Sequence, residues 1–176
     1  MFEVLGLRVG RLGEDDAPEI DALLSRCAEF IRIAEGHEPE GGDGLLLLNE
    51  RPNEAPEAQK LVLGVFDGPC LIGILDLLKD HPAPGVWHLG LMLLEPARRR
   101  AGIGTALVKG LGDWVEAQGG RALRLGVAEQ NAAGLRFWMR QGFRDIGSID
   151  EDLGPFRRTV HRMEFALPQL AGPGEA

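Results

Sequence analysis

The 176-residue sequence contains no tyrosine, and aromatic residues make up only 6% of it. No phenolic hydroxyl can therefore act as an acid, a base or a nucleophile in this protein. Only two cysteines are present, Cys27 and Cys70, and they lack the spacing of a zinc site or of a disulfide framework. Their scarcity is typical of a reducing compartment, and we expect no bound metal.

The chain also lacks any apolar run long enough to cross a membrane as a helix. Its first ten residues, MFEVLGLRVG, have neither the charged start nor the long apolar stretch of a signal peptide. We therefore expect a cytoplasmic protein with no membrane partner.

Positive charge is scarce as well, with 19 Lys and Arg against 27 Asp and Glu, so that the formal net charge is −8. Nucleic acids and anionic membranes require a basic surface, so this balance argues against both partners. The run Arg98–Arg100 is the local exception.

With 44% hydrophobic residues the chain can bury a core. We expect one domain over residues 1–168 and a disordered tail over 169–176.

Apolar residues follow the alternation or the short continuous runs typical of strands, and the three- or four-residue steps typical of helices. Strands are expected at residues 3–12, 60–66, 70–78, 86–94, 122–128, 143–149 and 159–167, and helices at 18–33, 102–119 and 131–140. The segment 35–59 is expected to hold a short helix within a long irregular connection. A connection of this length is either functional or a mobile surface excursion.

The most informative stretch joins the expected strand 86–94 to the helix that follows it. Pro96 ends the strand because it has no N–H group for a sheet hydrogen bond. Gly102 and Gly104 then open the helix, where unpaired N–H groups and the positive end of the helix dipole favour an anion. With Arg98–Arg100 beside it, this turn predicts a phosphate site, although glycines also begin helices for packing reasons alone.

Two motifs carry a family resemblance. The first is Arg-x-x-Gly-x-Gly over Arg99–Gly104, with Pro96 three residues earlier. The second is NAAGLRFWMRQGF over residues 131–143, which is similar to Asn-x-x-Ala-x-x-Phe-Tyr-x-x-x-Gly-Phe. Together, in order and spacing over about residues 60–165, they resemble the GNAT superfamily of acyl-CoA N-acyltransferases.

The resemblance implies an α/β (α+β) fold with a mixed, mostly antiparallel central sheet flanked by helices. It also implies a split between the strands 86–94 and 122–128, where a cofactor pairs with exposed backbone N–H and C=O groups. It assigns coenzyme A binding to Leu93, Leu94, Arg99, Arg100, Ala101, Gly102, Ile103, Gly104, Thr105, Asn131 and Trp138. Asn131 is at the same time a good N-cap for the helix that follows it.

The implied activity is that of an acetyl-CoA-dependent N-acetyltransferase, in which a primary amine attacks the thioester directly within a ternary complex. The acceptor is expected to be a small amine or a peptide amine that approaches past Phe30, Glu35 and His37. Neither cysteine lies near the motifs in the sequence, so an acyl-cysteine intermediate has no support there. We expect a monomer or a homodimer.

His88 is the candidate general base, since it stands where the family often has Glu or His and imidazole titrates near neutral pH. A structural, hydrogen-bonded histidine is the alternative reading, and Asp76, Glu95 and Glu129 are further candidates for the base. Trp138 stands at the place of the family's Tyr, which can act as a general acid. An indole N–H donates a hydrogen bond but does not release its proton, which places that role in doubt.

The missing tyrosine motivates a second hypothesis, an acetyl-CoA-binding regulatory module with little or no catalysis. A dinucleotide-binding Rossmann fold is disfavoured, because Leu107 stands where its motif needs a third glycine. The turn also comes late in the chain, whereas the Rossmann turn follows an early strand.

Overall fold

The computed structural model describes residues 1–35, 38–153 and 156–168. Its strands are β1 (Phe2–Val4), β2 (Leu7–Arg11), β3 (Lys60–Asp67), β4 (Cys70–Leu78), β5 (Val86–Leu94), β6 (Ala122–Ala128), β7 (Arg144–Leu153) and β8 (Phe156–Ala166). Its helices are α1 (Ala17–Arg26), α2 (Ala28–Glu35), α3 (Asp43–Asn49), α4 (Ile103–Ala117) and α5 (Ala132–Arg140). The expected tail, residues 169–176, lies outside the described residues.

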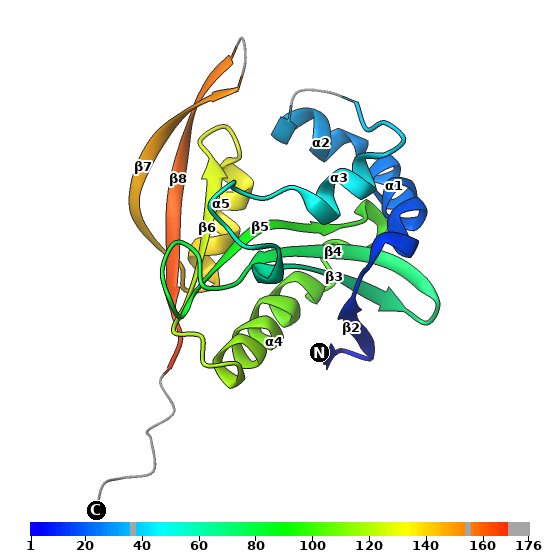
Figure 1. The fold of residues 1–176 in the computed structure, drawn as a ribbon, viewed down its shortest axis with the longest axis horizontal. Helices are drawn as coiled ribbons and strands as arrows, with labels where there is room; N and C mark the ends of the chain where they lie inside the picture. Colours follow the sequence, from blue (N-terminus) through cyan, green and yellow to red (C-terminus); the bar gives the residue numbers. More distant parts are fainter. Residues whose placement is uncertain (36–37, 154–155, 169–176) are drawn as a thin grey trace, which may run out of the picture.

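These strands form one sheet in the order β1-β2-β3-β4-β5-β6-β8-β7 (Figure 1). Neighbouring strands are antiparallel except β5 and β6, which run parallel. The mixed, mostly antiparallel sheet flanked by helices is therefore confirmed.

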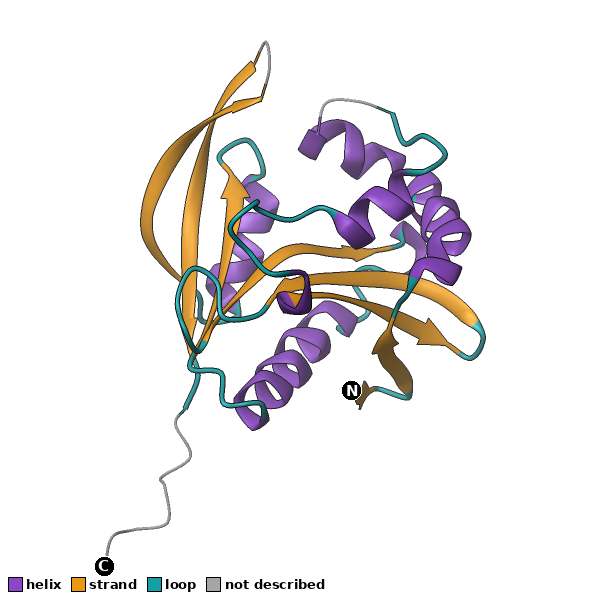
Figure 2. Ribbon diagram, in the orientation of Figure 1, coloured by secondary structure: helices purple, strands orange, loops and turns teal. Residues whose placement is uncertain are grey.

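Helices cover both faces of the sheet (Figure 2). On one face α1 buries Ile20 in the same apolar cluster as Ile74 of β4. On the other face α4 buries Leu107 and Leu111 in a cluster with Leu75 of β4. Because successive side chains of a strand point to opposite faces, Ile74 and Leu75 each anchor one layer of helices.

Two expected elements are each divided in the structure. The expected strand 3–12 is the hairpin β1–β2, because Leu5 and Gly6 turn the chain with φ angles of 50° and 78°. The expected helix 18–33 is α1 followed by α2, and the break falls at Cys27, whose backbone has φ −106° and ψ 17°. The final hairpin β7–β8 is longer than expected, whereas β6 has its predicted bounds. The short helix expected within residues 35–59 is α3.

Candidate active site

The strands β5 and β6 pair over one short stretch and then separate. Val86–His88 of β5 are in register with Ala122–Arg124 of β6, and the described chain shows no pairing between the two strands beyond these residues. The strand β6 continues to pair with β8, and β5 continues to pair with β4. One edge of each strand is thereby left open, which is the split that the resemblance implied (Figure 1).

The register of β4 and β5 shows which backbone groups of β5 face this split. The N–H group of Glu95, which directly follows β5, donates to the carbonyl of Ile72 in β4 at 2.9 Å. Because the direction of these groups alternates along a strand, those of Leu93 face β4 and those of Met92 and Leu94 face the split. Of the two residues predicted on β5, Leu94 can offer its backbone N–H group to a ligand, since its carbonyl already accepts from Nε of Arg99, whereas the backbone of Leu93 serves the sheet.

A bulge interrupts β5 at Gly90. Asp76 pairs with Leu91 and Leu77 pairs with Leu89, so Gly90 has no partner on β4. A Cβ atom added at Gly90 would lie 3.1 Å from Oδ2 of Asp76. The missing side chain therefore leaves room for the Asp76 carboxylate over β5.

The turn before α4 has the geometry of an anion site. Arg100 and Gly102 adopt φ angles of 65° and 79°, and left-handed residues in such a turn gather successive N–H groups into a concavity. No side chain among the described residues caps α4 at Gly102. The first N–H groups of α4, those of Ile103, Gly104 and Thr105, are thus available to a bound anion.

The three arginines of this turn differ in their contacts. Arg98 forms an ion pair with Asp67 at 2.7 Å, and Nε of Arg99 donates to the carbonyl of Leu94 at 2.8 Å. Both side chains therefore hold the turn against neighbouring strands. Arg100 is exposed at the edge of the cavity described below, where it can meet an anion.

The two glycines of the motif serve different purposes. A Cβ atom at Gly102 would have nothing within 4 Å, so its side of the turn is open. A Cβ atom at Gly104 would lie 3.3 Å from the ring of Phe137. Gly104 thus permits close packing of α4 on α5, and both explanations of these glycines apply, one to each residue.

Asn131 and Trp138 form the α5 side of the site. Oδ1 of Asn131 accepts a hydrogen bond from the N–H group of Gly134 at 2.9 Å and so caps α5. A Cβ atom at Gly134 would lie 2.5 Å from Nδ2 of Asn131, so glycine leaves room for this cap. The indole of Trp138 packs edge-on against Phe137 and Phe143, with ring centroids 5.0 and 5.1 Å apart. Trp138 therefore forms an aromatic wall.

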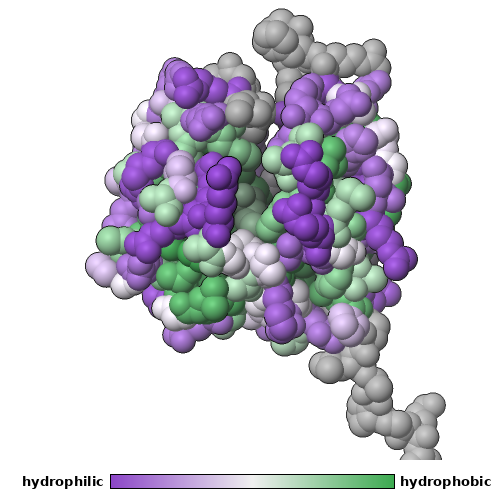
Figure 3. All heavy atoms as spheres, turned by 180° about the vertical axis from the view of Figure 1, so that it is seen from behind, coloured by the Kyte–Doolittle hydropathy of each residue, from purple (hydrophilic) through white to green (hydrophobic). Residues whose placement is uncertain are grey.

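A cavity of about 1000 Å³ follows the split from the turn before α4 to Phe30 of α2. From the back, Figure 3 shows the molecule hollowed between its two halves. The predicted cofactor residues that line this cavity are Leu93, Leu94, Arg99, Arg100, Gly102, Gly104, Thr105, Asn131 and Trp138. Ala101 and Ile103 are not among its lining residues.

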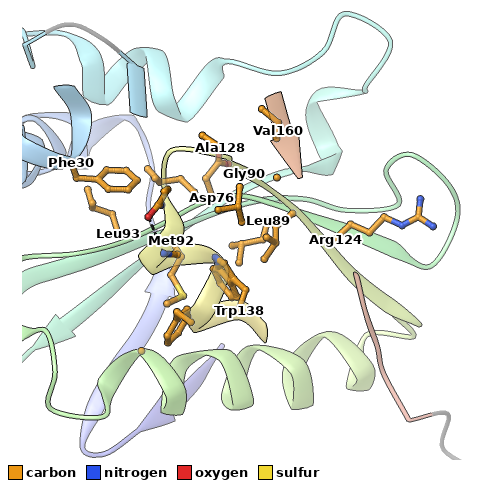
Figure 4. A pocket seen from close by; sticks show the side chains of 18 of the residues that line it. Phe30, Asp76, Leu89, Gly90, Met92, Leu93, Arg124, Ala128, Trp138 and Val160 are labelled. Atoms are coloured by element: carbon orange, nitrogen blue, oxygen red, sulfur yellow. Dashed lines mark hydrogen bonds between the residues drawn. The ribbon is translucent and has the colours of Figure 1, made fainter. Parts of the chain in front are cut away.

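Asp76 occupies a central place in this cavity (Figure 4). Its Oδ1 forms an ion pair with Nζ of Lys60 at 2.8 Å, and the side chains are only 16% and 8% exposed. Burial raises the pKa of the Asp76 carboxyl, although Lys60 acts in the opposite direction. The nearby charge of Glu50, which follows α3, also raises this pKa.

His88 is placed where the split closes. It is half-buried and in register with Leu78 on one side and Arg124 on the other. Its ring centroid lies 6.2 Å from that of His81 in an edge-on arrangement. His88 and Asp76 both line the large cavity and a second cavity of about 470 Å³ beside it. The structure thus brings the two candidate bases to one place.

The other candidates are placed less favourably. Glu95 is bound by Nε of Arg26 at 3.0 Å, and Glu129 is exposed and does not line either cavity. Cys27 lies closer to the site than its sequence position suggested, since its Sγ is 3.8 Å from the carbonyl oxygen of Leu94. The thiol is buried, however, and burial raises its pKa. Such a thiol is a poor nucleophile.

The expected acceptor route is described only in part. Phe30 lines the large cavity, whereas the side chain of Glu35 and all of His37 lie outside the described residues.

Within the described ranges, no group of three or more His, Cys, Asp or Glu residues could hold a metal ion. No helix described here combines the length and the apolar character needed to span a membrane.

The sequence matches the acetyltransferase (GNAT) family over residues 20–143. The chain belongs to the GNAT acetyltransferase family. Its predicted membership and its class, an acyltransferase enzyme, are thereby confirmed. No curated protein matches the sequence significantly.

Solved structures of GNAT acetyltransferases share the fold. The ribosomal-protein-S18-alanine N-acetyltransferase of Escherichia coli is 17% identical, with a TM-score of 0.69 over 97% of this chain and 99% of its own. Spermidine N-acetyltransferase of Vibrio cholerae, solved with CoA and spermine, is 20% identical, with a TM-score of 0.72 over 92% and 96% of the two chains. A Salmonella typhimurium protein solved with acetyl-CoA is 17% identical, with a TM-score of 0.66 over 97% and 99%.

Several charged residues of the site escaped the sequence analysis. Lys60 is a charged residue at the start of an apolar strand, which is a weak signal for a buried ion pair. Glu50 lies in the irregular connection after α3 and has no recognisable pattern. Arg158 and Arg162 stand two residues before and after Val160 and so share its face of the strand, but a charged residue in a strand is by itself an ordinary sign of a solvent-facing side chain.

Proposed function

We propose that this GNAT protein is an acetyl-CoA-dependent N-acetyltransferase that transfers the acetyl group to a primary amine by direct attack in a ternary complex. The observation that supports this most is that one cavity joins the anion turn before α4 to the open edges of β5 and β6. A donor with a pyrophosphate and a chain of amides fits these two features. Its phosphates would meet Gly102–Thr105 and Arg100, and its amides would pair with Met92 and Leu94.

The reaction requires an uncharged amine nitrogen that attacks the carbonyl carbon of the thioester. The new C–N bond forms and the C–S bond breaks, while the amine proton passes to a base and the sulfur takes up a proton to become the free thiol. A backbone N–H group from Met92 or Leu94 would stabilise the developing negative charge on the carbonyl oxygen, an effect worth about 3 kcal/mol per donor in other enzymes. A thiol has an ordinary pKa of about 8.5, so its thiolate can leave without a protein acid. The absence of tyrosine is therefore compatible with catalysis.

His88 is the base in this proposal, and Asp76 is the second candidate. Both groups line the two adjoining cavities, so an amine held between them lies within reach of either. Asp76 offers Oδ2 over the gap left by Gly90, since its Oδ1 is bound to Lys60. The buried ion pair keeps this carboxylate fixed in place.

Acetyl transfer across a panel of amines tests the proposal. Release of free thiol from acetyl-CoA, with the acetylated product identified by mass spectrometry, is expected for at least one class of primary amine. If acetyl-CoA binds and no amine in the panel is acetylated, the result would favour the regulatory module with little catalysis.

The anion turn is tested by a matched pair of glycine variants, one just before and one just after α4. Gly102 and Gly119 have φ angles of 79° and 81°, and at neither would a Cβ atom meet anything within 4 Å. Substitution by Ala should therefore strain the backbone equally, by about 1–2 kcal/mol. Only Gly102→Ala should weaken acetyl-CoA binding in calorimetry, because only its Cβ enters the anion site. Equal affinities in Gly102→Ala and Gly119→Ala would disprove the assignment.

We further propose a cytoplasmic monomer or homodimer that binds neither nucleic acid nor membranes. The support is the formal net charge of −8, which disfavours polyanionic surfaces. Gel filtration and sedimentation of the purified chain would decide the oligomeric state.

A further inference from the structure

The large cavity carries a charge that contrasts with the charge of the chain. The formal net charge is −8, yet among the described residues that line this cavity the arginines outnumber the acidic residues. The arginines of the lining are Arg99, Arg100, Arg124, Arg140, Arg158 and Arg162, and its acidic residues are Glu50 and Asp76. Clefts with an excess of one sign of charge concentrate ligands of the opposite sign, so the arginine-rich part of this cavity favours anions.

The donor accounts for only part of this positive charge. Arg99 and Arg100 belong to the turn before α4, which the phosphates would occupy. Arg158 and Arg162 lie on β8 instead, and Arg162 is in register with Gly126 of β6. In the same register Arg124 pairs with Glu164 of β8 and with His88 of β5. Residues in register on neighbouring strands have their side chains on the same face of the sheet. Arg158 and Arg162 therefore lie on the same face as the candidate base His88 and not beside the turn.

The arginines on this face are not equally available. Arg124 is bound through its Nε to Glu164, which neutralises it. Arg162 is exposed, and the structure shows no ion pair or hydrogen bond between its side chain and the described residues. Arg158 stands four residues earlier on the same strand, separated from Arg162 by the cavity residue Val160. Arg162 and Arg158 therefore form a positive wall along β8, and Arg162 is the member most available to a ligand.

The opposite part of the cavity holds the two acidic residues of its described lining, of which Asp76 is paired with Lys60. Asp76 on β4 and Glu50 after α3 both line the large and the second cavity, away from β8. Figure 4 shows Asp76 and Val160 on different strands that border the same space. A ligand that spans this space meets carboxylates at one end and guanidinium groups at the other.

We propose that the acceptor is a primary amine that also carries an anionic group, such as a carboxylate. Arg162 binds the anion, with the positive charge of Arg158 beside it on β8, and this directs the amine toward Asp76 and His88. Guanidinium groups suit this task because they match carboxylate and phosphate oxygens with two parallel hydrogen bonds. This inference rests on the proposed N-acetyltransferase function and names the substrate class of the same site.

The test compares amines that share a primary amino group and differ in the anion. The substrates are γ-aminobutyrate, aminopropylphosphonate and n-butylamine, and kcat/KM is measured by thiol release with the full-length protein. We expect the anionic amines to be preferred by about 10- to 100-fold, as for one charge-assisted hydrogen-bonded pair. Comparison of γ-aminobutyrate with aminopropylphosphonate shows whether the site prefers a carboxylate or a phosphonate-like group. The preference should weaken as salt is raised.

A variant of the positive wall tests whether Arg162 causes the preference for anionic amines. Arg162→Gln should raise KM for the preferred anionic amine by about tenfold or more and leave n-butylamine and the acetyl-CoA affinity unchanged. Arg144→Gln is the matched control, since Arg144 is exposed on the neighbouring strand β7 and does not line the cavity. Loss of acetyl-CoA affinity in Arg162→Gln would assign this arginine to the donor and overturn the proposal.

The remaining outcomes separate this inference from the proposed function. Equal or better turnover of n-butylamine would overturn the anionic acceptor and leave the N-acetyltransferase intact. If no amine is acetylated, calorimetry of each amine with the complex of protein and coenzyme A decides the question. Binding of an anionic amine that Arg162→Gln abolishes would support the inference, and binding of none would overturn it.

Discussion

Replacement of Lys60 by Met tests whether the buried ion pair holds Asp76 in its charged form. The substitution keeps the length and apolar stem of the side chain and removes only its charge. At the observed separation of 2.8 Å, the attraction between the two charges is about 6 kcal/mol for an effective dielectric constant of about 20. Removal of one partner from a buried pair costs less than this in practice, about 3–5 kcal/mol, because the remaining group relaxes or becomes protonated.

The loss should depend strongly on pH. Burial already raises the pKa of Asp76 in the presence of Lys60, and removal of the cation raises it further. A carboxyl group with a raised pKa in the folded state adds stability below its unfolded pKa, about 3.9. That stability disappears as the pH rises through the folded pKa. Lys60→Met should therefore cost about 3–5 kcal/mol near pH 8 and much less near pH 5, where Asp76 can take up a proton.

Urea unfolding of wild-type protein and variants at the two pH values measures this difference. Lys109→Met is the matched control, because Lys109 pairs with Asp113 on α4 with both side chains exposed, 77% and 65%. An exposed pair of this kind contributes at most about 0.5 kcal/mol. Similar losses for Lys60→Met and Lys109→Met at pH 8, or a Lys60→Met loss that does not shrink at pH 5, would refute the reasoning.

Three further predictions concern the site. If His88 is the base, His88→Ala should lower kcat/KM by about 10²–10⁴ and remove the acidic limb of the pH–rate profile; unchanged turnover with an unchanged profile would shift the role to Asp76. Asn131→Ala should cost about 1 kcal/mol of stability through loss of the α5 cap, whereas Asn131→Asp should retain the cap. Equal unfolding midpoints for the two variants would contradict this. Trp138→Phe should leave kcat nearly unchanged, since a general acid would be worth about 10²–10⁴; a loss of that size would show that the indole N–H is needed.

Local sequence patterns were sufficient for most elements of this fold. The nearly continuous apolar runs of β3, β4 and β5 and the apolar stripe of α4 are strong signals, because β3 and β4 are buried on both faces and α4 buries one full face. The break at Cys27 and the turn at Leu5–Gly6 were not predicted, because the apolar pattern continues across both.

The donor side of the site was also readable from the sequence. The anion turn depends on residues close together in the chain, and a helix start with two glycines has much the same local geometry in any fold. Asn131 and its cap are likewise local. Only the separate purposes of Gly102 and Gly104 required the structure, since the Phe137 ring that approaches Gly104 comes from a distant segment.

The acceptor side could be assembled only by the tertiary structure. Lys60, Asp76, His88 and Arg162 stand on four different strands, and their proximity depends on sheet order, register and the bulge at Gly90. None of these is encoded in a short stretch of sequence, because a shift of one residue in register would turn each side chain to the opposite face. The chain by itself thus determined its family, its main elements and the turn for the donor phosphates. The sheet decided which charges face one another across the cavity, because burial and pairing between distant strands set the position and the pKa of Asp76.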